Sequence, residues 1–173
     1  MPGSGVGPRK IAELESQLAT EDERPSLTMF VDPKRHEKIP SKPTTFRVVV
    51  KNDGGVKIDD ISVRVKSVEP PSDKMNKYRD VPLHQKHNNT PPYDEYFSLI
   101  AGEEKEIDVI AGNDGAATFC VCHIVDGLYP WVTCDLGHRN FEFFLEAKSE
   151  DASCEITVVV RDDDNNRLIF ERE

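Results

Sequence analysis

Residues 46–69, with the sequence FRVVVKNDGGVKIDDISVRVKSVE, constrain the fold of this chain more than any other stretch. Two runs rich in β-branched residues flank a polar break at Asn52-Asp53-Gly54-Gly55. An alternation with a period of two is typical of antiparallel strands, and Asn, Asp and Gly are common turn residues. The stretch therefore predicts two antiparallel strands around a turn or short loop. They could be neighbours, or they could lie in opposite sheets with the break crossing one end.

The same alternation continues to the end of the chain. Strands are predicted at Leu27–Val31, Phe46–Lys51, Ile61–Val68, Val81–Gln85, Tyr96–Leu99, Glu106–Ile110, Thr118–Val125, Phe141–Ala147, Glu155–Arg161 and Leu168–Glu171. Most have one apolar and one polar face; Arg47 and Asp108, for example, are expected to point to solvent. Pro and Gly punctuate the breaks between them. The pattern predicts an all-β fold, an antiparallel two-sheet sandwich with a solvated face on each strand.

The first 25 residues predict a separate element. Ile11, Leu14 and Leu18 form a narrow apolar stripe at helical spacing, and Pro25 ends it. We expect residues 1–25 to form a flexible leader with a short N-terminal helix, and residues 26–173 to form the sandwich domain. The helix could dock on the sandwich, or it could pair with a second copy and form a homodimer.

Charge and hydropathy exclude several classes of partner. The 173 residues carry a formal net charge of -10, which repels phosphate backbones and anionic lipids, so we expect no nucleic-acid binding. No apolar run approaches the roughly 20 residues of a membrane span, so no membrane insertion is expected. The opening MPGSGVGPRK does not read as a secretory signal, which predicts a cytoplasmic protein with its four cysteines reduced.

Several segments together resemble an immunoglobulin-like β-sandwich module found in uncharacterised bacterial and archaeal proteins. The matching segments are FRVVVKNDGG, DDISVRVKSVE, PLHQKHNN, FSLIAGEEKEIDVI and FEFFLEAKSEDASCEITVVVRDDDNNRLIFERE. The resemblance runs from about Thr28 to the end, and its motifs are mostly turn motifs. It implies an immunoglobulin-like fold, and it brings no catalytic residues to this chain.

Two aromatic segments are candidates for contact with a protein partner. Leu128, Tyr129 and Trp131 follow Gly127, and Trp and Tyr dominate the energetics of protein interfaces. The same cluster could instead close one end of the sandwich. Tyr93, after Pro91-Pro92, belongs to the long polar excursion from Glu69, and connections of this length are often functional.

Three polar clusters could hold metal. Asp162, Asp163 and Asp164 offer clustered oxygens to Ca²⁺, although Asp-Asn runs are also ordinary turns. The second cluster is His84 and His87, in a His-x-x-His spacing that also fits two solvated loop histidines. The third contains the cysteines, which lack a Cys-x-x-Cys pair and fit buried thiols; their positions are Cys120, Cys122, Cys134 and Cys154.

No phosphate loop, nucleophile elbow or zinc-protease motif occurs in the chain. The abundant carboxylates are spread over predicted outward positions and turns. We therefore expect a protein that is not an enzyme and needs no cofactor, a non-catalytic module for protein–protein interaction or an accessory domain. The alternative is a Ca²⁺- or carbohydrate-binding β-sandwich, with Tyr129 and Trp131 as a sugar platform.

Overall fold

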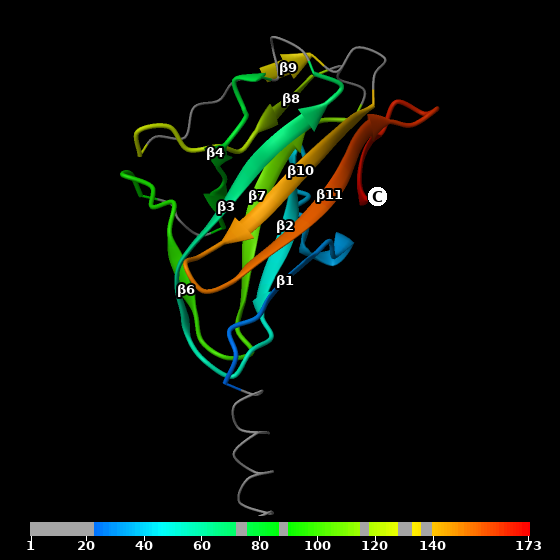
Figure 1. The fold of residues 1–173 in the computed structure, drawn as a ribbon. Helices are drawn as coiled ribbons and strands as arrows, with labels where there is room; N and C mark the ends of the chain where they lie inside the picture. Colours follow the sequence, from blue (N-terminus) through cyan, green and yellow to red (C-terminus); the bar gives the residue numbers. More distant parts are fainter. Residues whose placement is uncertain (1–22, 72–75, 87–89, 115–117, 128–132, 136–139) are drawn as a thin grey trace, which may run out of the picture.

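The strands of the chain gather into two antiparallel sheets in the computed structural model, and one core lies between them (Figure 1). The structure describes residues 23–71, 76–86, 90–114, 118–127, 133–135 and 140–173. An all-β, sandwich-like fold of two antiparallel sheets is therefore confirmed. The helix predicted within residues 1–25 lies outside the described residues, so its docking or pairing stays a prediction.

Each sheet joins strands that are distant in the sequence. The order in the first sheet is β1 (Leu27–Phe30), β2 (Thr44–Asn52), β7 (Glu104–Gly112), β8 (Thr118–Val121) and β9 (Thr133–Asp135), with β5 (His84–Gln85) also on β7. The order in the second is β12 (Leu168–Arg172), β11 (Ser153–Asp162), β10 (Phe141–Lys148), β3 (Ile58–Glu69) and β4 (Val81–Pro82), with β6 (Phe97–Leu99) also on β3. A short 3₁₀ helix, η1 (Pro33–Arg35), follows β1.

The polar break in residues 46–69 crosses one end of the molecule, because β2 and β3 lie in different sheets. Asn52 is fully buried there, and its side-chain amide donates to the carbonyls of Val56 and Leu99. A Cβ on Gly54 would lie 2.1 Å from the carbonyl oxygen of Arg24, so only glycine lets these segments approach so closely. The break therefore secures the segment that leads into β1.

The predicted inward faces build the core. Buried side chains at a period of two include Phe46, Val48 and Val50 of β2, Ile61, Val63 and Val65 of β3, and Phe141, Phe143 and Leu145 of β10. A register shift in the β2–β7 pairing, where Phe46 faces Ile110 and Arg47 faces Asp108, interrupts the alternation. This bulge explains why both Val109 and Ile110 are in the core.

The prediction of a single strand at Val81–Gln85 is wrong. Val81 and Pro82 pair with β3 in the second sheet, whereas His84 and Gln85 pair with β7 in the first. Leu83, between the two pairs, is almost fully buried. The chain therefore changes sheets within five residues. Leu83 is buried at the crossing as an inward residue of a strand would be, so the segment has the alternating pattern of one strand.

Two other predicted boundaries also change. The strand expected at Thr118–Val125 ends at Val121, because the next residues turn across the sandwich, and Ile124 N–H donates to the carbonyl of Pro82 at 2.8 Å. Val125 is consequently exposed. Strand β9 was not predicted, because Thr133–Asp135 is too short to show a period.

Candidate functional site

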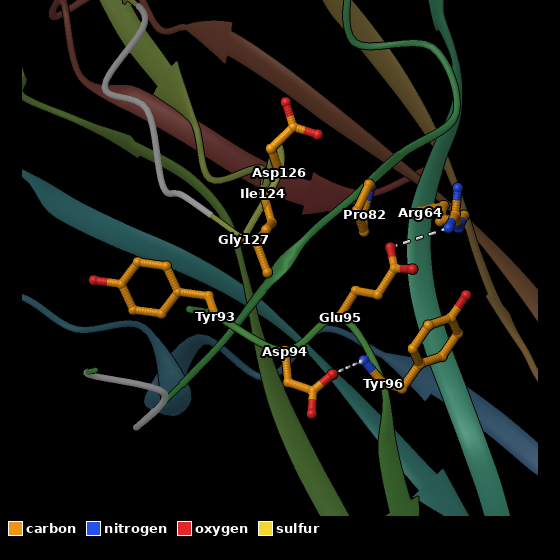
Figure 2. Close-up of a pocket in the computed structure, with 9 residues that line it drawn as sticks. All are labelled: Arg64, Pro82, Tyr93, Asp94, Glu95, Tyr96, Ile124, Asp126 and Gly127. Atoms are coloured by element: carbon orange, nitrogen blue, oxygen red, sulfur yellow. Dashed lines mark hydrogen bonds and ion pairs between the residues drawn. The ribbon is translucent and has the colours of Figure 1, made fainter. Parts of the chain in front are cut away.

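A hollow of about 480 Å³ opens beside the crossing between the sheets (Figure 2). Four parts of the described chain form its wall: β3, β4, the segment before β6 and the turn after β8. The lining residues are Arg64, Pro82, Tyr93, Asp94, Glu95, Tyr96, Ile124, Asp126 and Gly127. Its volume falls within the roughly 300–1,000 Å³ of typical ligand pockets.

Backbone contacts fix the two loops of the hollow against each other. Tyr93 N–H donates to the carbonyl of Gly127 at 2.9 Å. Gly127 has a φ of 70°, and a Cβ there would lie 3.0 Å from Cβ of Pro92. The preceding Asp126 also has a positive φ, of 51°. The turn after β8 therefore needs glycine both for its backbone conformation and for its approach to the Pro91-Pro92 segment.

Strand β5 holds the other side of the hollow. The Gln85 side-chain amide donates to the carbonyls of Asp94 at 2.9 Å and Tyr96 at 3.3 Å. The neighbouring His84 contacts the ring of Tyr93 edge to face, with centroids 5.1 Å apart. These two buried side chains thus hold the whole Tyr93–Tyr96 segment from beneath.

The charges around the hollow are predominantly negative. Arg64 is the single cation among the described lining residues, and its NH2 group pairs with Glu95 at 3.1 Å, as the dashed line in Figure 2 shows. Asp94 accepts from Tyr96 N–H at 3.4 Å. The exposed Asp126 carboxylate makes no hydrogen bond or ion pair with any residue in the described part of the chain. The described lining thus contains three carboxylates and one guanidinium.

A buried polar network supports β5 from the outer side of the first sheet. Asp108 accepts from Arg47 Nε at 2.6 Å through Oδ1, and its Oδ2 lies 2.9 Å from Nδ1 of His84. Arg47 also donates to Glu37 at 2.6 Å. Arg47, His84 and Asp108 are 4%, 7% and 7% exposed. The sequence analysis placed Arg47 and Asp108 in solvent, and that prediction is wrong because other segments cover this face.

The segment after η1 forms part of this cover. Nδ1 of His36 accepts from the backbone N–H of Arg47 at 3.0 Å, and its ring contacts Phe46 and Phe170 edge to face. Burial, together with the charge of Arg47, lowers the pKa of His36. The neutral imidazole is therefore the form that fits this position.

An ion-pair cluster lies at the margin of the same cover. Glu106 pairs with Lys86 from β5's end and with Arg35 from η1 at 3.4 Å. Burial opposes ionisation of Glu106, but the hydrogen bonds and charges of Lys86 and Arg35 outweigh it and lower its pKa. Arg35 also pairs with Glu104 at 2.8 Å. The cluster thus links β5 and η1 to β7 through ionised side chains.

The structure brings one predicted contact residue into the hollow. Tyr93 lines it, whereas Leu128, Tyr129 and Trp131 lie outside the described residues. Gly127, which immediately precedes that aromatic cluster in the chain, does line the hollow. Of the predicted contact residues, the described part of the chain therefore brings Tyr93 alone to the hollow.

The interpretation of His84 as a solvated loop residue is wrong, because strand β5 buries it against Asp108; His87 lies outside the described residues. Within the described ranges, no group of three or more His, Cys, Asp or Glu side chains could hold a metal ion. Cys154 is a free thiol, and burial raises its pKa to about 11. The Cys134 side chain lies outside the described part.

The acidic loop between β11 and β12 has the contacts of a turn. The Asp163 carboxylate accepts from the backbone N–H groups of Asn165 and Arg167, both at 2.9 Å, and from Arg167 Nε at 2.8 Å. One carboxylate oxygen of Asp162, Oδ1, is buried without a partner among the described residues. Hydrogen bonds within the turn thus engage the Asp163 carboxylate. The Ca²⁺ site at Asp162, Asp163 and Asp164 stays a prediction.

The sequence analysis missed most of the lining. Arg64 and Asp126 read as ordinary strand and turn residues, and only the fold brings them together. Tyr96 offered a signal, since PPYDEY places two tyrosines and two carboxylates at the end of the polar excursion. For the buried network, the traces were the interruptions of apolar runs by Arg47 in FRVVV and by Asp108 in IDVI.

No helix within the described ranges is long and apolar enough to cross a membrane. Comparisons of the chain with protein family models, curated proteins and solved structures found no match.

Proposed function

We propose that this chain is a non-catalytic recognition module, of the immunoglobulin-like type, that binds a protein partner at the hollow. The observation that carries the proposal is the meeting of the Tyr93–Tyr96 segment with the turn that ends at Gly127. Loops held on a rigid sheet scaffold are common sites of binding. Here β5 holds one loop by hydrogen bonds, and Gly127 joins it to the other.

Exposed apolar surface gives the hollow an anchor for a partner. Tyr96, which lines the hollow, is 45% exposed. Val125, beside the lining residue Ile124, is 44% exposed. Tyrosine contributes strongly to interfaces because its ring combines apolar area with a polar group. The fixed backbone beneath it lowers the entropic cost of binding. We therefore assign Tyr96 the central contact and Tyr93 a supporting one.

Site-specific photocrosslinking tests this proposal. A photoreactive amino acid replaces Tyr96 in one variant and Ile100, an exposed residue of the β6–β7 turn, in a matched control. We expect the variant at position 96 to capture a partner from native cell extract that the control does not capture. That partner, once purified, should bind Tyr96→Ala about tenfold or more weakly than wild type, and Ile100→Ala equally well. Equal binding of all three proteins would refute the proposal.

The exposed ring of Tyr96 also favours a second candidate, a carbohydrate ligand. An aromatic ring beside carboxylate acceptors can stack on a sugar and bind its hydroxyl groups. Titration with neutral oligosaccharides distinguishes the two, because saturable binding that Tyr96→Ala abolishes would support the sugar and displace the protein partner.

We propose a cytoplasmic location for this module. The free thiol of Cys154 supports it, since a reducing compartment preserves unpaired cysteines. Labelling of the Cys154 thiol in intact cells, before and after lysis, tests the location.

A further inference from the structure

We propose that the hollow receives an arginine side chain of the partner, an inference that rests on the proposed function and names its ligand class. Three features of the hollow support it: the balance of charge, the state of Arg64, and the exposed ring of Tyr96. Each is independent of the identity of the partner.

The balance of charge favours a cation. Among the described residues, the lining contains three carboxylates, Asp94, Glu95 and Asp126, and one cation, Arg64. Figure 2 shows Asp94 and Asp126 at opposite ends of the lining, so a negative charge lies at each end of the hollow. Asp126 is exposed, and no described residue pairs with its carboxylate. The formal net charge of -10 adds long-range attraction for basic segments.

The contacts of Arg64 disfavour an anion. Its Nε donates to Ser62 Oγ at 3.2 Å, one terminal nitrogen donates to the carbonyl of Asp80 at 3.0 Å, and the other donates to Glu95 at 3.1 Å. Every nitrogen of the guanidinium therefore already donates to the protein. A phosphate or carboxylate would have to break these bonds and also approach three carboxylates.

The rings select arginine over lysine. Figure 2 shows Tyr93 and Tyr96 on opposite sides of the hollow, and Tyr96 is 45% exposed. A planar guanidinium stacks on an aromatic face and donates in its own plane to carboxylates, whereas an ammonium is a strongly hydrated point charge. A volume of about 480 Å³ accommodates one such long side chain.

The test uses three blocked tripeptides, Gly-Arg-Gly, Gly-Lys-Gly and Gly-Glu-Gly, titrated into the ¹⁵N-labelled full chain. We expect the arginine peptide to shift the amide signals of residues 93–96 and 124–127 in a saturable manner. The lysine peptide should bind more weakly, and the glutamate peptide should not bind. Asp126→Asn should weaken arginine binding by about threefold, the range of an exposed charge pair, because asparagine tolerates the same positive φ. Tyr96→Leu should weaken it further.

Asp151→Asn is the matched control, because it removes one negative charge from the exposed turn between β10 and β11. If Asp126→Asn and Asp151→Asn weakened binding of the arginine peptide equally, the effect would come from the net charge of the protein and not from the hollow. That result would overturn the inference. So would binding of the glutamate peptide, equal binding of the lysine peptide, or the absence of any arginine-dependent shift. If position 96 captures a partner but the arginine peptide does not bind, only the ligand class fails. If no partner binds there, the proposed function itself fails.

Discussion

The outer faces of the two sheets have the same sequence pattern but different surroundings. On the second sheet, Arg161 of β11 pairs with Glu171 of β12 at 3.3 Å, and these side chains are 35% and 54% exposed. On the first sheet, Arg47 and Asp108 pair at 2.6 Å and are almost fully buried. The alternation of residues therefore reports the direction of a side chain, but it does not report whether another segment covers it.

The cover of the first sheet has a functional consequence. The segments that bury Arg47 and Asp108 include β5 and the residues around η1, and β5 also holds the Tyr93–Tyr96 loop. The outer face of the first sheet thus supports the candidate site, whereas the corresponding face of the second sheet presents partly exposed side chains. Substitutions made separately on each face, with the loss of stability measured for each, test this difference.

The largest effect is expected from Arg47→Ala. Removal of the guanidinium leaves Asp108 as a buried charge whose main cationic partner is gone. Loss of one member of a buried pair typically costs about 3–5 kcal/mol, so we expect a fall of that size in the free energy of unfolding in urea. The exposed Arg161→Ala should cost less than about 1 kcal/mol. Similar losses in both variants would show that the two faces do not differ in energy.

Gly127→Ala should produce the next largest effect. The positive φ destabilises alanine by about 1–2 kcal/mol relative to glycine. The added Cβ would also lie 3.0 Å from Cβ of Pro92, which would have to move. Gly102→Ala is the matched control, since Gly102 has a φ of 80° but no atom within 4 Å of an added Cβ. Thermal unfolding should therefore show a larger loss for position 127. The opposite order would mean that the loops are not held together there.

These contrasts explain how far the sequence could predict the molecule. Alternation at Phe46, Val48 and Val50 was sufficient to predict the core-facing side of β2, because burial on one face creates that pattern. The crossing at Leu83 was not predictable, since a strand that changes sheets keeps its period. Tyr93 was found from the chemistry of its segment, whereas Arg64 and Asp126 come together only through pairings distant in sequence.

The pH dependence of stability tests the cover at His36. Because burial lowers the pKa of His36 in the folded chain, protons bind preferentially to the unfolded chain as the pH falls below about 6.5. Stability is therefore present at pH 7 and is lost as the pH falls toward the folded-state pKa. His36→Asn keeps an acceptor for the Arg47 N–H but cannot titrate, so its melting temperature should fall less between pH 7 and pH 5. An unchanged pH profile would place this imidazole in solvent.

The smallest effect is expected at the β11–β12 turn of the more exposed second sheet. Asp163→Ala removes the acceptor of three hydrogen bonds and should lower the melting temperature less than the substitutions above. Hydrogen bonds, first that from the Arg167 backbone, lower the pKa of Asp163, so its contribution is present at neutral pH and is lost below about pH 4. The variant and the wild type should converge there.

Calcium gives this last comparison a second outcome. Both oxygens of Asp163 already accept hydrogen bonds from the turn, so a cation would have to compete with Arg167 for this carboxylate. If the turn alone explains the acidic residues, Ca²⁺ and EDTA should leave the melting temperature of the wild type unchanged. A rise with Ca²⁺ that Asp163→Ala abolishes would instead establish the metal site at Asp162, Asp163 and Asp164. It would also place a ligand on the second sheet, and the hollow beside β5 would no longer be the leading candidate.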